Sequence, residues 1–209
     1  GAVVMRQGTT LSPSHIGALA ELGRAVVDVV RPARVAIVAT GDELVPVEAD
    51  PGPGQIRNSN QEMLAAQITR MGAVAVPLGI ARDNETDLSE KIRAGLHADI
   101  LMLSGGVSAG ILDLVPRTLH EAGVVEVFHK VRLKPGQPLW FGIRPASTDR
   151  AACVVFGLPG NPVSSMVCCD LFGQAAVRNL QGQTPAAREP LCVRLSRAFE
   201  HRGDRPTFH

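Results

Sequence analysis

The strongest constraint on the fold is a regular alternation between short β-branched apolar runs and amphipathic helical segments. Runs typical of strands occupy residues 34–40, 73–81, 99–104, 124–134, 138–143 and 152–158. Segments with helical spacing lie between or after these runs, at 58–72, 84–97, 112–123 and 161–180. This order predicts an α/β fold with three layers, in which a mostly parallel sheet carries helices on both faces.

The two ends of the chain depart from this alternation. A strand-like stretch and a short helix fill residues 1–31, whereas residues 184–209 are rich in Pro and Arg and hold one strand-like stretch at 191–196. We interpret 1–31 as the remnant of an N-terminal domain, 32–183 as the α/β domain, and 184–209 as the start of a truncated C-terminal β-domain. A small β-rich fragment is therefore expected at each terminus.

Composition excludes several classes of function. The net charge is +1, aromatic residues make up only 3% and Tyr is absent, which argues against a dedicated nucleic-acid or membrane surface. No apolar run is long enough to span a bilayer. The four cysteines, Cys153, Cys168, Cys169 and Cys192, lack zinc spacing. We predict reduced thiols in a cytoplasmic protein.

Three loops with glycine and hydroxyl residues follow predicted strands, at 40–43, 104–110 and 158–165. Ligands of open parallel sheets bind at the carboxyl ends of the strands, where these loops would lie. Glycines allow the backbone to approach a ligand, and a helix that begins at Asn161-Pro162 would offer N–H groups to an anion. The loops predict a phosphorylated ligand, although glycine-rich turns that merely connect strands to helices are the alternative.

Four carboxylates follow the predicted strands at the same edge: Asp42, Glu43, Asp83 and Asp113. Convergent carboxylates beside a phosphate site favour a hard cation, most plausibly Mg²⁺. Each has an alternative role, because Asp83 and Asp113 precede helices and could be N-caps, and Asp42 could satisfy its own turn.

Three cations alternate with apolar residues in the stretch HKVRLKPG. If this stretch is a strand, Lys130, Arg132 and Lys134 share one face and could bind an oxyanion. A solvated strand face is the alternative. Because no Ser-His-Asp or Cys-His arrangement is present, we expect electrostatic chemistry rather than a covalent nucleophile.

Seven motifs occur in the order found in one known family: GTTLSPSHIGALAELG, VAIVATGDEL, GQIRNSN, GIARDN, SGGVSAGILD, KPGQP and LPGNPVSS. On these motifs the chain resembles the molybdopterin molybdenumtransferases, the MoeA/gephyrin E-domain family. The resemblance implies that the core is a molybdopterin-binding domain. It also implies a reaction in which adenylylated molybdopterin and molybdate give molybdenum cofactor and AMP, with help from Mg²⁺.

The resemblance also implies roles for individual residues. The catalytic set would be Glu43, Asp83, Asp113, Lys130 and Lys134, with the three acids as metal ligands and the two lysines near molybdate. The pterin substrate would lie over the glycine-rich loops, on Thr40, Gly41, Asp42, Ser104, Gly105, Gly106, Val107, Ser108, Gly110, Pro159, Gly160, Asn161, Pro162 and Ser164.

The sequence departs from the family pattern at three places. Asn58 stands where Asp is usual, Ile111–Leu114 replace a more polar stretch, and Gln137 stands where Lys is common. The resemblance implies a homodimer at full length, with a molybdopterin adenylyltransferase and molybdoenzymes as partners. Two other functions remain open, a molybdopterin adenylyltransferase and a non-catalytic pterin-binding or scaffold module.

Overall fold

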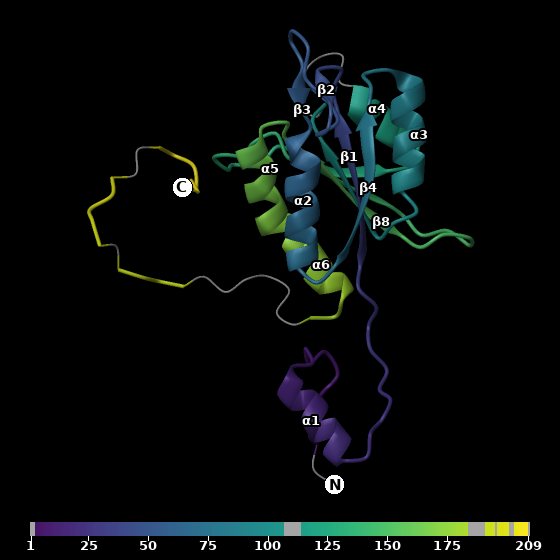
Figure 1. Cartoon of the computed structure of the whole chain (residues 1–209), viewed down its shortest axis with the longest axis vertical. Coiled ribbons are helices and arrows are strands. Elements are labelled where there is room, and N and C mark those ends of the chain that lie inside the picture. Colours follow the sequence, from purple (N-terminus) through teal and green to yellow (C-terminus); the bar gives the residue numbers. More distant parts are fainter. Residues whose placement is uncertain (1–2, 107–113, 184–190, 195, 201–202, 209) are drawn as a thin grey trace.

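A computed structural model of the chain describes residues 3–106, 114–183, 191–194, 196–200 and 203–208. Its centre is a sheet of six strands in the order β4–β1–β5–β8–β7–β6 (Figure 1). The strands are β1 (Arg34–Thr40), β4 (Val74–Ala81), β5 (Ile100–Ser104), β6 (Val125–His129), β7 (Trp140–Arg144) and β8 (Cys153–Leu158). The pairs β1/β4, β1/β5 and β5/β8 are parallel, whereas β7 is antiparallel to both β8 and β6. The mostly parallel sheet that the alternation predicts is therefore confirmed.

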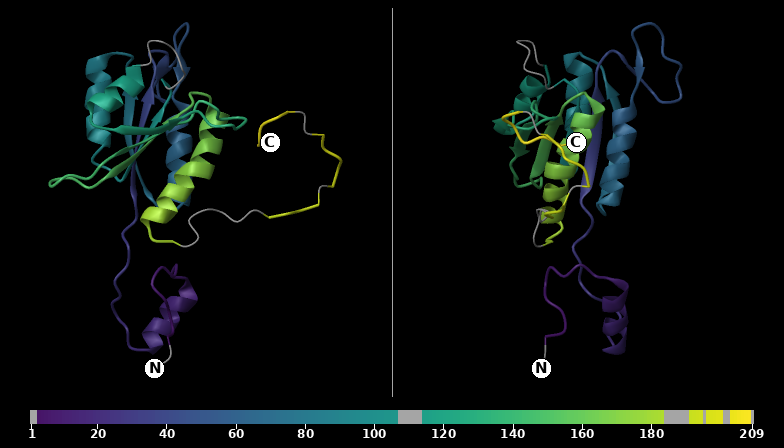
Figure 2. Two further views of the ribbon diagram at one scale, coloured as in Figure 1. Left: turned by 180° about the vertical axis from the view of Figure 1, so that it is seen from behind. Right: turned by 90° about the vertical axis from the view of Figure 1, so that its left-hand side faces the viewer.

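Helices cover both faces of the sheet (Figure 2). One face carries α2 (Ser59–Arg70) and a long helix made of α5 (Pro162–Cys168), the π-helical turn η1 (Cys169–Gly173) and α6 (Gln174–Leu180). The other face carries α3 (Glu85–Gly95) and α4 (Leu114–Glu121). The structure thus has the predicted three layers.

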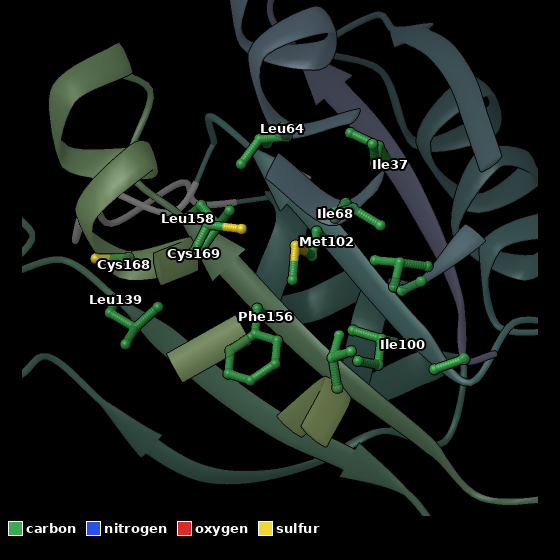
Figure 3. Close-up of a cluster of buried hydrophobic side chains, with 14 of the residues drawn as sticks. Ile37, Leu64, Ile68, Ile100, Met102, Leu139, Phe156, Leu158, Cys168 and Cys169 are labelled. Atoms are coloured by element: carbon green, nitrogen blue, oxygen red, sulfur yellow. The ribbon is translucent and has the colours of Figure 1, made fainter. Parts of the chain in front are cut away.

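The alternation of side chains along the strands divides the core in two. Residues such as Ile37 and Met102 point to one face, where they pack with Leu64 and Ile68 of α2 and with the buried Cys169 (Figure 3). Their sequence neighbours, among them Val38, Leu101 and Leu103, pack on the opposite face against α3 and α4. Because β1 and β5 are buried on both faces, they read as continuous apolar runs.

Trp140 is the single tryptophan of the chain and belongs to the second of these clusters. Its ring lies over Gly142, because a β-carbon there would stand 2.8 Å from Cζ3 of the ring. Its indole N–H donates to Glu126 at 2.8 Å, so the only polar atom of the buried ring is paired.

A second, much smaller sheet stands at the carboxyl edge of the main one. It is a parallel pair of two-residue strands, β2 (Leu44–Val45) and β3 (Ile56–Arg57). The Pro- and Gly-rich residues 46–55 connect them as a surface loop. The strand β2 begins directly after the acidic TGDE loop at residues 40–43 and so marks the end of that loop.

The strands predicted at the two ends are absent from the described residues. The helix α1 (Pro13–Glu21) forms as predicted, with Ser12 as its N-cap, but residues 3–12 and 191–194 contain no strand. The helix buries none of its residues and stands apart from the layered body in every view (Figures 1 and 2). A strand needs a partner for its backbone groups, and the described part of the chain offers none beside these segments. Among the described residues, no helix has the length and apolar character needed to cross a bilayer.

Candidate functional site

The sheet reverses its strand order between β1 and β5. From β1 the chain passes through α2 to β4 on one side, and after α3 it returns as β5 on the other side of β1. The carboxyl ends of the two central strands lie together here, with Ala39 of β1 in register with Ser104 of β5. Such a reversal opens a crevice beyond the strand ends and is the usual ligand site of an open α/β sheet.

Asn60 joins the loops at this crevice, and our sequence reasoning did not single it out. Its side-chain amide donates to Ser104 Oγ at 2.7 Å and to the Gly160 carbonyl oxygen at 2.8 Å. A carbonyl oxygen can only accept a hydrogen bond, so the amide nitrogen of Asn60, and not its amide oxygen, faces Gly160. One side chain from the first turn of α2 therefore holds the end of β5 and the loop after β8 together. The only sequence signal for it was its place in the motif GQIRNSN.

Glycine is required where the loop after β5 crosses the end of β1. Gly105 and Gly106 have φ angles of 100° and 64°, in the left-handed region. A β-carbon on Gly105 would stand 2.5 Å from the Thr40 carbonyl oxygen, and one on Gly106 would stand 2.8 Å from Thr40 Oγ1. The N–H of Gly105 donates to the Leu158 carbonyl at 3.1 Å. The three predicted loops therefore pack against one another at backbone distance.

A pocket of about 70 Å³ opens between these loops. Several residues predicted from the sequence line it, namely Thr40, Glu43, Ser104, Gly160 and Pro162, together with Asn58 and Asn60. Thr40 Oγ1 and Asn60 Oδ1 are buried and have no hydrogen-bond partner among the described residues. Buried polar atoms are nearly always paired in proteins, so these two mark a place where a ligand group or water completes the bonding.

The start of α5 is less open to anions than the sequence indicated. Asn161 is the N-cap, as predicted, but its side chain already accepts from the N–H groups of Val163 and Ser164, at 3.0 and 3.2 Å. Ser165 Oγ donates to the carbonyl of Pro159, which closes the loop on itself. Two of the N–H groups at the start of α5 are therefore already taken, and the loop at Pro159 is stiffened.

Three of the predicted acids converge beside the pocket. Asp42 Oδ1 accepts the N–H of Asp83 at 3.1 Å, so Asp42 links two loops and does not satisfy its own turn. Partial desolvation raises the pKa of the Asp83 carboxyl, and the charges of Asp42 and Glu43 raise it further. The N-cap of α3 is Asn84, which leaves the Asp83 carboxylate free of that alternative role. A carboxyl whose pKa is raised by neighbouring carboxylates is typical of a cation site.

The predicted metal set is not complete within the described residues. No group of three or more His, Cys, Asp or Glu side chains with metal-binding geometry is found in that part of the chain. Asp113 lies outside the described residues, as do Val107, Ser108 and Gly110 of the predicted pterin-binding loop and most of the Ile111–Leu114 departure. Gly41 packs tightly against the Glu43 carboxylate, with its β-carbon position 2.7 Å from Glu43 Cδ, so this carboxylate is folded back over its own loop.

The prediction that the three cations of HKVRLKPG share a strand face is wrong. The strand β6 ends at His129, and Lys130 has a φ of 72°, which turns the chain out of the sheet. Lys130, Arg132 and Lys134 instead lie on a loop whose Gly136 packs against α5, where its β-carbon would stand 2.6 Å from Cys168 Sγ. The loop is closed by bonds from the N–H of Lys130 to the Leu139 carbonyl and from that of Val131 to the Gln137 carbonyl.

A C-terminal segment adds a further cation to this loop. The N–H of Lys134 donates to the Pro206 carbonyl at 3.0 Å, and the N–H of Phe208 donates back to Lys134 at 2.8 Å. Arg205 Nη1 donates to Gln137 Oε1 at 2.5 Å. The sequence did not predict this role of Arg205, because its contact with Gln137 joins residues that are 68 positions apart. A lysine at position 137 would repel it, so the Gln137 departure is compatible with this pairing.

Comparison with known proteins identifies the family of the layered body. Residues 36–179 match the family described as "Probable molybdopterin binding domain". The molybdopterin molybdenumtransferase of a Nostoc species is 38% identical over 196 residues, which cover 93% of this chain and 44% of that protein. The enzyme of the same name from Haemophilus influenzae is 36% identical over 191 residues, covering 91% and 46%. The chain therefore spans less than half the length of these relatives.

Solved structures give the same relationship. A molybdopterin biosynthesis moeA protein from Pyrococcus horikoshii superposes with a TM-score of 0.71 at 28% identity, over 85% of this chain and 43% of that one. The tungsten cofactor synthesizing protein MoaB from Pyrococcus furiosus, at 16% identity and a TM-score of 0.52, shares the fold. With its matched segment running from β1 to α6, the chain belongs to the molybdopterin-binding domain family, and the relatives it matches are molybdopterin molybdenumtransferases.

Proposed function

We propose that this domain binds adenylylated molybdopterin and supports the insertion of molybdate, with release of AMP. The observation that carries the proposal is the pocket at the strand reversal, where Thr40 Oγ1 and Asn60 Oδ1 are buried without partners beside Glu43. A pocket of about 70 Å³ is too small for a whole pterin, so it would receive only a polar edge of the ligand, whose donors and acceptors would satisfy these atoms. The names of the matched relatives support the same substrate class.

Magnesium is the cation that we propose for the acidic edge of the site. Glu43, Asp83 and Asp113 would hold it, and the raised pKa of the Asp83 carboxyl, to which desolvation and the charges of Asp42 and Glu43 contribute, supports this proposal. When bound, Mg²⁺ would neutralise phosphate oxygens as the bond to AMP breaks. The protein itself holds the acids in place and keeps the phosphate end of the substrate near them.

Molybdate would approach from the basic loop. Lys130, Lys134 and Arg205 supply cations there, next to the start of α5 and Ser164. Cations and hydroxyls stabilise an oxyanion without forming a covalent bond to it. We further propose that the protein works in the cytoplasm, where its four free thiols stay reduced, and as a homodimer.

The experiment is to measure AMP release from adenylylated molybdopterin by chromatography, with and without Mg²⁺ and molybdate. We expect release that needs both ions, and we expect Glu43→Gln to reduce it at least tenfold because the variant removes one carboxylate from the cation site. Glu90→Gln, an exposed carboxylate on α3, is the matched control and should retain full release.

Other results would identify other functions. Tight binding of the substrate without AMP release would leave a pterin-binding module and contradict the transferase. Consumption of ATP with release of pyrophosphate would identify an adenylyltransferase instead.

A further inference from the structure

An irregularity in β4 determines where its last residues point. Pro77 pairs with Ile37 and Ile80 pairs with Ala39, so Leu78 and Gly79 stand opposite the single residue Val38. This bulge is held by two side chains, because Gly79 N–H donates to Gln61 Oε1 at 3.1 Å and Lys91 Nζ donates to the Leu78 carbonyl at 2.8 Å. After the bulge the register recovers, and Ala81 pairs with Thr40 at the end of β1. Arg82 is therefore the first residue beyond the sheet, next to the TGDE loop.

The Arg82 side chain crosses to that loop and binds its backbone. Nη1 donates to the carbonyl oxygen of Asp42 at 3.2 Å and to that of Leu44 at 3.0 Å. These two carbonyls flank Glu43 on either side. The backbone of Arg82 is anchored as well, because its main-chain N–H donates to Asp87 Oδ2 at 2.7 Å, in the first turn of α3.

The choice of carbonyls over carboxylates matters for the site. Asp42, Glu43, Asp83 and Asp87 all lie close in sequence to these contacts, yet among the described residues Arg82 forms no ion pair. A guanidinium carries five N–H donors, and here both bonds to main-chain oxygens come from the single nitrogen Nη1. It thus brings positive charge to an acidic loop without occupying the Glu43 carboxylate, which stays available to another ligand.

We propose that Arg82 is a positioning residue that holds the 42–44 loop, and with it the Glu43 carboxylate, at the rim of the pocket. The effect of Arg82 on catalysis rests on the proposed function, whereas its effect on the position of the loop does not. Two separate readouts follow, one for the loop and one for the reaction. Arg82 is distinct from the acids and lysines assigned above, because it acts through the backbone on either side of Glu43.

The first readout is amide hydrogen exchange of the peptide that covers 40–46, measured without ligand on the whole chain. Arg82→Met keeps an unbranched side chain but removes both bonds, and we expect exchange in this peptide to rise about tenfold. Peptides from α2 and α5 should be unchanged. Arg93→Met, an exposed arginine on the outer part of α3, is the matched control and should leave the 40–46 peptide as in the wild type.

Unchanged exchange in Arg82→Met would overturn the proposal. If Arg82→Met loses protection throughout the chain, Arg82→Lys decides, because it keeps a cation on a side chain that is one bond too short to reach the position of Nη1. Faster exchange confined to 40–46 in Arg82→Lys supports the proposal, and wild-type exchange there contradicts it.

The second readout is the AMP-release assay. We expect Arg82→Ala to lower kcat about tenfold with little change in KM, because the loop carries an acid that acts in the transition state. Added methylguanidine should restore part of the rate in Arg82→Ala, and methylammonium should restore less, because it lacks the planar group that places Nη1 between the two carbonyls. A variant that turns over like the wild type would remove the catalytic part of the proposal. A wild type without AMP release would contradict the proposed function alone, because the exchange result does not depend on it.

Discussion

The side chain of Asn60 donates to the carbonyl of Gly160 at 2.8 Å, across 100 residues of sequence. The same amide donates to Ser104 Oγ, so the start of α2, the end of β5 and the loop before α5 meet at one nitrogen. Among the described residues, no other side chain hydrogen-bonds to both the end of β5 and the loop before α5. The shape of the pocket therefore depends on this one residue.

We predict that Asn60→Ala lowers the free energy of unfolding by about 1–3 kcal/mol, because it leaves the Gly160 carbonyl and Ser104 Oγ without their donor. Asn60→Asp should cost more, since a carboxylate would then face a carbonyl oxygen. Urea unfolding at neutral pH measures both. Asn179→Ala, on the exposed end of α6, is the control and should change the stability little. Equal stabilities of Asn60→Ala and the wild type would show that Asn60 does not hold the loops together.

We predict that Gly41→Ala damages the site more than the fold. Gly41 has a φ of 146°, and its β-carbon would overlap the Glu43 carboxylate. We expect a stability loss of about 1–2 kcal/mol together with displacement of Glu43, so that AMP release falls at least tenfold. The control is Gly17→Ala in α1, where a β-carbon would meet nothing within 4 Å. This variant should leave AMP release unchanged. Normal release from a folded Gly41→Ala would separate Glu43 from the reaction.

Much of the fold could be predicted because its signals are local. The apolar runs of β1 and β5 are buried on both faces and read directly as central parallel strands. The N-cap Asn161 could also be predicted, because capping uses side chains within three residues. The loops at the strand ends followed from the general rule for ligand sites of open sheets.

What could not be predicted depends on contacts between distant segments. Lys130 continues an alternating pattern, but it adopts a left-handed φ and leaves the sheet because the loop closes on Leu139. Asn60, Arg82 and Arg205 are polar residues on surface segments, and only the folded chain brings them to Gly160, Leu44 and Gln137. Residues 3–12 resemble a strand in composition, yet no partner strand lies beside them in the described part of the chain.

We predict that a thiol reagent at pH 8 modifies one cysteine quickly and three slowly. Burial raises the pKa of Cys153, Cys168 and Cys169 to about 12, so almost no thiolate is present and the sulfur atoms are enclosed. Cys192 is exposed and should account for the fast phase, which Cys192→Ser should abolish. In denaturant all four should react at similar rates. A second fast thiol in the native protein would contradict the packing of α5 and η1 against the sheet.

Asp99 anchors the segment before β1. Its carboxylate accepts two bonds from Arg31, at 2.7 and 2.6 Å, and one from the N–H of Arg34 at 2.8 Å. The Arg31 guanidinium lowers the pKa of the Asp99 carboxyl, and the Arg34 bond lowers it further. A carboxyl whose pKa is lower in the folded state stabilises the fold at pH values above its unfolded pKa of about 3.9. That stabilisation is lost as the pH falls through the lowered value.

We therefore expect Asp99→Asn to reduce the midpoint of thermal unfolding by about 2–4 °C at pH 7, where the wild-type carboxylate is fully charged. The difference should shrink below about pH 4 and vanish once the wild-type carboxyl is protonated as well. Thermal unfolding followed by Trp140 fluorescence from pH 7 down to the acid limit of the folded state measures it. Asp50→Asn is the control, because the Asp50 side chain is fully exposed in its pair with Arg57 and should show no such dependence. A difference between Asp99→Asn and the wild type that stays constant with pH would mean that the carboxylate charge does not anchor this segment.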